Sequence, residues 1–169
     1  MGSHTSPADV QQVLDAFRRI VQALRESSRA AESRAGLTGA QLFVLQVVAD
    51  GQPLSINEVA ERTHTHQSSV SVVVQRLVDT GLLRRRRSEE DGRRQELSLS
   101  AKGERHLKDS PDTAQRELID AIAALPEKQR VELARTLGTL ASAVAPGTKP
   151  PAMFFEDKKA PRAKGRRNG

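Results

Sequence analysis

Residues 54–103 decide the fold, and they read LSINEVAERTHTHQSSVSVVVQRLVDTGLLRRRRSEEDGRRQELSLSAKG. Ser55 and Glu58 form a capping-box pattern, which predicts a short helix from residue 56. The stretch THTH from Thr63 breaks that helix, and a second helix runs to about residue 80, where Gly81 is placed as a left-handed stop. The turn between them has no glycine, so we predict left-handed backbone at His64, because histidine is among the few other residues enriched at positive φ.

Two short strands follow this helix pair. Residues 82–87 and 95–99 alternate apolar and polar side chains in part, and Asp91-Gly92 marks a turn between them, so the segment predicts an antiparallel hairpin. The segment thus contains a short helix, a four-residue turn, a second helix and a hairpin. This is the order of a winged helix-turn-helix, whose second helix fits a DNA major groove. The expected fold class is mainly α with a small β-hairpin wing (α+β).

Helices are expected on both sides of this region. Ser6-Pro7 starts a long helix that stops before Gly36, a Thr38–Gln41 capping box opens a helix over 39–49, and Ser100 caps a fifth helix. Ser110-Pro111 is expected to kink or break the fifth helix, and Pro126 opens a sixth that runs to about residue 144. The expected division is an N-terminal segment outside the fold or a cloning remnant (1–7), a dimerisation helix (8–37), the winged helix-turn-helix (38–100), dimerisation helices (101–145) and a basic tail (146–169).

Composition narrows the class of protein. The chain has no cysteine, which excludes disulfides, thiolate nucleophiles and sulfur-ligated zinc. No apolar run is long enough for a membrane span and no signal peptide opens the chain, so we expect a cytoplasmic protein without membrane contact. The net charge is +6, and residues 146–169 carry seven Lys/Arg against Glu156 and Asp157. The six arginines between residues 84 and 94 form the strongest basic excess elsewhere, which favours a polyanionic partner.

The second helix of the pair has two different faces. Val70, Val73, Val74, Leu77 and Val78 recur at helical spacing and form a core stripe. The opposite face and the amino-terminal end carry side chains that can bond bases or phosphates, or meet a thymine methyl. The expected DNA-contacting residues here are His66, Gln67, Ser68, Ser69, Ser71, Val72, Gln75 and Arg76. The alternative is that this is simply the solvated face of an amphipathic helix.

The segment 54–103 resembles the MarR family of bacterial transcription regulators, dimeric winged-helix proteins, and the likeness in element order extends over about residues 8–145. The resemblance implies that Arg93, in the pattern Asp91-Gly92-Arg93, is held by the aspartate and enters the minor groove of DNA. Arg86, Arg87 and Arg94 are expected to contact phosphates, although arginines on a strand can equally be a solvated face. His64 and His66 lack a clear third ligand, so we expect no metal and no cofactor.

A homodimer is expected for two reasons. The first helix is too long and too apolar along one side for a monomer to cover, and the resemblance implies pairing through the terminal helices on a pseudo-palindromic operator. The candidate interface residues, about half of which could instead line the monomer core, are Val10, Val13, Phe17, Leu118, Ile122, Leu133, Leu137, Leu140, Phe154 and Phe155. The two phenylalanines lie in an otherwise polar tail that we expect to be mobile, and such scarce anchors are expected to dock on the dimer. Lys158 to Arg167 are expected to add salt-sensitive, non-specific affinity for DNA.

The expected function is a sequence-specific regulator of transcription, and a repressor, that binds double-stranded DNA. Many relatives respond to small acids bound between the dimer helices and the DNA lobe, so the resemblance implies an effector of unknown identity against Phe17, Phe43 or aliphatic walls. Three other readings stay open. An architectural DNA binder would use the basic wing and tail without sequence preference. A winged helix used only for protein contacts is disfavoured by the polar face, and an enzyme is disfavoured because no catalytic motif is present.

Overall fold

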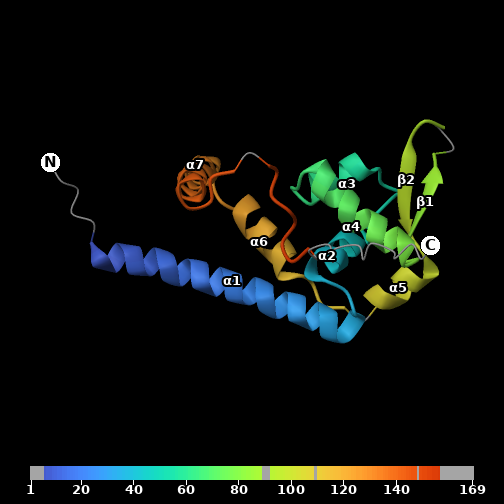
Figure 1. The fold of residues 1–169 in the computed structure, drawn as a ribbon, viewed down its shortest axis with the longest axis horizontal. Coiled ribbons are helices and arrows are strands. Elements are labelled where there is room, and N and C mark those ends of the chain that lie inside the picture. The colour runs from blue at the N-terminus through green and yellow to red at the C-terminus, as the bar shows by residue number, and fades with distance from the viewer. Residues whose placement is uncertain (1–5, 89–91, 109, 148, 157–169) are drawn as a thin grey trace, which may run out of the picture.

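The computed structural model describes residues 6–88, 92–108, 110–147 and 149–156. The described part of the chain contains a winged-helix lobe at one end and three long or outlying helices at the other (Figure 1). The elements in chain order are α1 (Pro7–Ala35), α2 (Gly39–Ala49), α3 (Ile56–Arg62), α4 (Gln67–Asp79), β1 (Leu83–Arg87), β2 (Gln95–Leu99), α5 (Ala101–Leu107), α6 (Ala114–Ala123) and α7 (Glu127–Val144). The predicted fold class, mainly helical with one two-stranded hairpin, is confirmed.

Local capping chemistry sets the helix boundaries in the lobe. Both predicted capping boxes are formed: the Gln41 N–H donates to Thr38 Oγ1 at 3.2 Å, and the Glu58 N–H donates to Ser55 Oγ at 3.3 Å. Between α3 and α4, His64 has φ 49°, which confirms the predicted left-handed turn residue. Gly81 after α4 has φ 72°, as its role as a stop requires.

The lobe is closed by one apolar core. The predicted stripe of α4 is buried, except for the half-buried Val78, and packs against α2, where Phe43 is 2% exposed. The hairpin joins this core through Leu83 and Leu97, and an isolated bridge adds Leu54 to the outer edge of β2. Two backbone hydrogen bonds make that bridge: the Leu54 N–H donates to Leu97 O at 3.1 Å and the Leu97 N–H to Leu54 O at 2.7 Å. The hairpin is therefore held by two side chains in the core and by backbone hydrogen bonds on the outer edge of β2.

The helix after the hairpin belongs to the lobe. The Ser100 hydroxyl caps α5 as predicted, accepting from the Gly103 N–H at 3.0 Å, and α5 packs against α2 and β2. The expected division had placed residues 101–107 with the dimerisation helices, but their contacts are with the lobe. At Ser110-Pro111 the chain breaks rather than kinks, because α5 ends at Leu107 and α6 begins at Ala114. The expected fifth helix is thus two separate helices.

The remaining helices extend away from the lobe. The carboxyl end of α1 is embedded in it through Leu24, Ser28 and Ala31, and the amino-terminal half projects outward (Figure 1). Helix α6 packs on α1, and α7 lies above α1 in the same view. No residue of α7 is buried in the described structure. Most of the stability of a helix in a protein comes from packing of its apolar face, and α7 has little such packing within the described chain.

Candidate nucleic-acid interface

Helix α4 presents a polar surface on the side opposite the core. Gln67, Ser68 and Gln75 are exposed, whereas Ser71, Val72 and Arg76 are half-buried. The Ser71 hydroxyl donates to the Gln67 carbonyl at 2.8 Å, and Gln75 Nε2 donates to Asp79 Oδ1 at 2.7 Å. The Gln75 side chain is therefore already oriented along the helix, and it must leave Asp79 before its amide can bond a base edge in two places.

Ser69 lies elsewhere than the sequence suggested. It is 9% exposed, and its hydroxyl donates to the carbonyl of Pro151 at 3.0 Å. A hydroxyl held against the core side of α4 is not on the surface that carries Gln67 and Gln75. The Ser69 hydroxyl, which was expected to contact DNA, instead contacts the C-terminal segment of its own chain in this structure. His66 is exposed at the N-cap position of α4, where its side chain makes no capping hydrogen bond.

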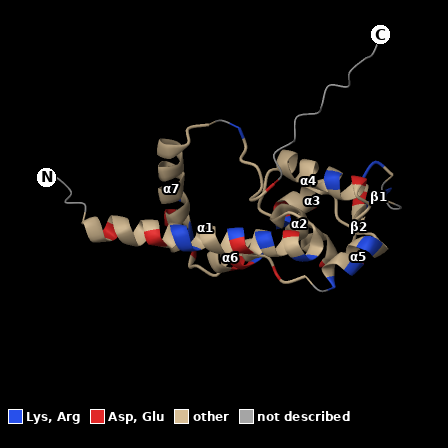
Figure 2. Cartoon of the chain, turned by 60° about the horizontal axis from the view of Figure 1, so that its bottom comes forward, with Lys and Arg blue, Asp and Glu red and all other residues tan. Residues whose placement is uncertain are grey.

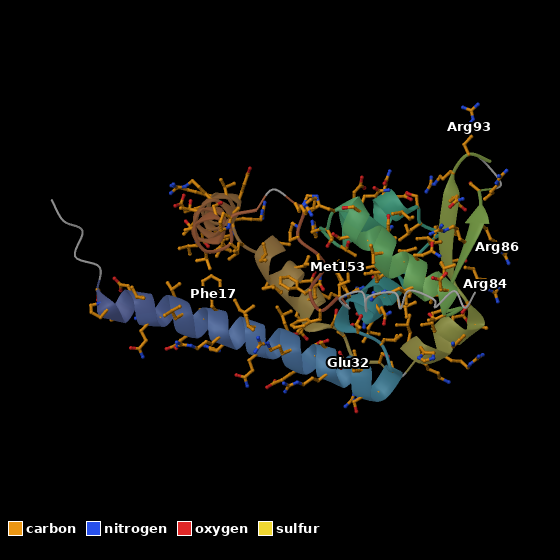
Figure 3. All side chains as sticks on the ribbon, viewed as in Figure 1. Phe17, Glu32, Arg84, Arg86, Arg93 and Met153 are labelled. Carbon is orange, nitrogen blue, oxygen red and sulfur yellow. The ribbon has the colours of Figure 1, made fainter. Side chains whose placement is uncertain are left out.

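The hairpin beside α4 carries the arginines. Arg84 to Arg87 are all exposed, and antiparallel pairing sets Arg86 opposite Glu96 and Arg87 opposite Gln95. Figure 3 shows Arg84 and Arg86 pointing away from the hairpin, and Arg93 extending beyond its tip. Lys and Arg residues also lie on α5, on the same end of the molecule (Figure 2). Asp91, expected to orient Arg93, lies outside the described residues together with Glu89 and Glu90.

Arg94 has a structural partner that the sequence did not reveal. Its Nη2 donates to Glu58 Oε2 at 2.6 Å, and its Nε lies 3.8 Å from Glu96 Oε1. Glu58 is the capping-box residue of α3, and its pKa is lowered by hydrogen bonds from the Ser55 N–H and hydroxyl and by the positive charge of Arg94. Arg94 therefore ties the wing to α3, which competes with the expected phosphate contact.

A broad apolar surface lies on the terminal helices. Phe17 points from α1 toward α7 and is 39% exposed (Figure 3). Of the expected interface residues, Val10, Val13, Phe17, Ile122, Leu137, Leu140 and Phe154 are exposed, and Leu118, Leu133 and Phe155 are half-buried. The same surface includes Leu14, Ile20, Val21 and Val131, which the candidate set omitted. On α1 the exposed apolar side chains recur at helical spacing and form one stripe, and an exposed stripe of this kind marks an interaction site.

A small cavity separates the lobe from α6. It has a volume of about 210 Å³ and is lined by Phe43, Val47, Asp50, Arg62, Arg116, Ile119 and Asp120. Arg116 Nη2 donates to Asp50 Oδ2 at 2.7 Å, but among the described residues its buried Nε has no hydrogen-bond partner. Such an unmet donor beside apolar walls suits an anionic or carbonyl-bearing ligand. The described residues contain no His, Cys, Asp and Glu cluster that could hold a metal ion.

Comparison with known proteins agrees with this arrangement. A model of the MarR family matches residues 35–94, which include α2 to α4 and β1, the first strand of the hairpin. The HTH-type transcriptional repressor MdtR of Bacillus subtilis is 32% identical over 139 residues, spanning 80% of this chain and 86% of that protein. Among the helices that the structure describes, none combines the length and hydropathy needed to cross a membrane.

Solved structures show the same fold. A probable transcriptional regulator from Pseudomonas aeruginosa is 27% identical with a TM-score of 0.51, covering 76% of this chain and 96% of its own. The regulator BldR from Sulfolobus solfataricus is 20% identical with a TM-score of 0.52, covering 83% and 100%. The matched proteins are regulators rather than enzymes, which confirms that expectation. With a helix-turn-helix and an arginine hairpin in this order, and a curated relative matched over most of its length, the chain belongs to the MarR family of transcriptional regulators.

Proposed function

We propose that this protein is a repressor of transcription that binds a pseudo-palindromic operator as a homodimer in the cytoplasm. The observation that carries the proposal is the pairing of the exposed polar face of α4 with an arginine hairpin on the same lobe. Helix α4 would enter the major groove, and Arg93 would enter the neighbouring minor groove. The name of the Bacillus subtilis relative supports repression as the direction of regulation.

The dimer follows from the uncovered terminal helices. Val10, Phe17, Leu137 and Leu140 are each more than a third exposed, and α7 buries nothing in the described chain. A second copy would cover these surfaces by two-fold symmetry and set two α4 helices in successive major grooves, about 34 to 36 Å apart. We place dimerisation in α1, α6 and α7, DNA binding in residues 38–107, and the basic tail after residue 145.

Titration of operator and scrambled duplexes at physiological salt tests sequence-specific binding. A regulator is expected to prefer its site by about 10³-fold or more. Equal affinity for both duplexes would instead support the alternative, an architectural DNA binder. Arg93→Ala should weaken operator binding by about 1 to 3 kcal/mol, whereas Arg25→Ala, an equal loss of charge on exposed α1, should change it little. Equal losses for the two variants would contradict the wing assignment.

Sedimentation tests the dimer. Phe17→Asp should shift the protein toward monomer, because it buries a charge in the apolar contact. Gln12→Asp is the matched control, since Gln12 lies on the opposite side of the α1 helix from the apolar stripe. A dimer of unchanged stability in Phe17→Asp would place the interface elsewhere.

The cavity between α2, α3 and α6 is our candidate effector site. Phe43 and Val47 supply apolar walls, and Arg62 and the unmet Nε of Arg116 supply hydrogen-bond donors for a small organic acid, while Asp50 and Asp120 balance the charge of the two arginines. Benzoate is a simple probe of this chemistry. It should raise the thermal midpoint of the wild-type protein and not that of Arg62→Leu, while an equal rise in both would argue against the cavity.

A further inference from the structure

The C-terminal segment returns from α7 to the winged-helix lobe. We call residues 149–156 the strap. Met153 in the strap is 4% exposed and belongs to the same apolar core as α2 and α4. Figure 3 shows its side chain directed into the molecule beside the lobe. The neighbouring Phe154 is 52% exposed, so the methionine and not the phenylalanine is the anchor.

A second contact fixes where the strap meets α4. The Ser69 hydroxyl donates to the Pro151 carbonyl at 3.0 Å, and Ser69 is the third residue of that helix. A carbonyl of the strap therefore lies at the amino-terminal turn of the proposed recognition helix. Met153 and Pro151 together hold the strap at one position, because one contact is apolar and buried and the other is directional.

The strap ends in a tight turn. The Glu156 N–H donates to the Met153 carbonyl at 3.2 Å, and the Met153 N–H donates to Glu156 Oε2 at 3.3 Å. Phe155 has φ 55°, a left-handed conformation that is uncommon for an aromatic residue. The turn holds Glu156, the last described residue, beside the buried Met153.

The sequence beyond the turn is strongly basic. Residues 157–169 read DKKAPRAKGRRNG, with six Lys/Arg and a single acid. We call them the arm. Thirteen residues reach at most about 40 Å at 3.3 Å per residue, several times the 10 to 12 Å diameter of a helix. Pro151, six residues before the arm, lies at the amino-terminal turn of α4, so the distal basic residues of the arm can reach phosphates beside that helix.

We propose that the strap is an anchor that delivers the arm to DNA phosphates next to the recognition helix of its own protomer. The arm would be a third DNA-contacting element, besides α4 and the hairpin, and its position would depend on Met153 and Ser69. This inference rests on the proposed DNA binding. The anchored arm would differ from a free polycation, because a tethered arm acts at one place on the duplex and at a high local concentration.

Salt dependence tests whether the arm touches phosphates. Truncation after Glu156 keeps the strap and removes six basic residues from each protomer, so the slope of log K against log salt should fall by up to about five per protomer, or about ten for the proposed dimer. The truncated protein should still prefer operator to scrambled duplex at low salt. An unchanged slope would overturn the arm contact, whereas loss of operator preference in the full chain would overturn the proposed function itself.

Site-directed cleavage tests whether the strap positions the arm. Because the chain contains no cysteine, Asp157→Cys, next to the strap, gives a single attachment point for an iron–EDTA reagent that cuts nearby DNA. Cutting should be confined to a few base pairs in each half-site. Met153→Ala should spread the cuts and lower the peak several-fold, Met153→Leu should restore the pattern, and Phe154→Ala should leave it unchanged.

Ser69→Ala provides a milder test, because it removes the hydrogen bond to Pro151 without opening the core. It too should broaden the cleavage pattern while the thermal midpoint stays close to that of the parent. Broad cutting by the parent protein, or cutting that stays equally confined in Met153→Ala and Ser69→Ala, would refute the anchor.

Discussion

Replacing Gly103 by alanine should destabilise this protein, although the same change normally stabilises a helix. A Cβ atom at Gly103 would lie 2.3 Å from the Leu82 carbonyl oxygen and 3.3 Å from Leu99 Cδ2. The carbonyl cannot move freely, because it also accepts from the Ser100 N–H at 3.0 Å. Alanine gains up to about 1 kcal/mol of helix propensity. Overpacking against backbone costs about 1 to 3 kcal/mol, and a weakened hydrogen bond adds about 1.

The expected net loss is about 2 kcal/mol, or roughly 4 to 8 °C in the thermal midpoint for a chain of this size. Gly138→Ala in α7 is the matched control, because nothing in the described structure lies within 4 Å of its new Cβ. That variant should be stabilised by about 0.5 to 1 kcal/mol. Both are measured by thermal denaturation at one protein concentration, since dimerisation contributes to stability. A Gly103→Ala protein as stable as Gly138→Ala would refute the close approach of α5 to the hairpin base.

Two further predictions concern the turn and the wing. His64 has φ 49°, so His64→Gly should raise the free energy of unfolding by about 0.5 to 1 kcal/mol and His64→Val should lower it by about 1 to 2 kcal/mol. Denaturant titration measures both, and the opposite order would contradict the left-handed backbone. The pKa of Glu58 is lowered in the folded chain, so its carboxylate stabilises the fold above the ordinary value of 4.5, and this contribution is lost as the pH falls through the lowered pKa. The stability advantage of wild type over Glu58→Gln should therefore be present at pH 6 and shrink below about pH 4.5; a pH-independent difference would argue against the Ser55 and Arg94 contacts.

The features that the sequence predicts correctly depend on residues that lie close together along the chain. Capping boxes act between residues three apart, so the starts of α2 and α3 follow from four letters each. The left-handed turn at His64 is equally local. The helical spacing of the apolar residues in α4 predicts which face packs in the core. The same spacing indicates the opposite, polar face, which we assign to DNA.

The features that the sequence does not predict are contacts between residues that lie far apart along the chain. Arg94 and Glu58 are 36 residues apart, and Ser69 and Pro151 are 82 apart. Neither pair has a sequence signal, because a hydrogen bond between remote segments depends on how the whole lobe closes. The sequence predicts docking of the tail through Phe154 and Phe155, whereas the structure buries Met153 and leaves Phe154 half exposed. Burial selected the unbranched methionine, which can fill an irregular gap in a core.

Helix α1 carries a constraint on how this chain can change length. One unbroken helix of 29 residues has its carboxyl end embedded in the lobe and its amino-terminal half in the surface that we assign to the second copy. Each inserted residue would turn that surface by about 100° and advance it by 1.5 Å relative to the lobe. A single insertion between Phe17 and Leu24 would misdirect both halves of a dimer. An insertion of seven residues would nearly restore the angle but separate the two recognition helices beyond one turn of DNA.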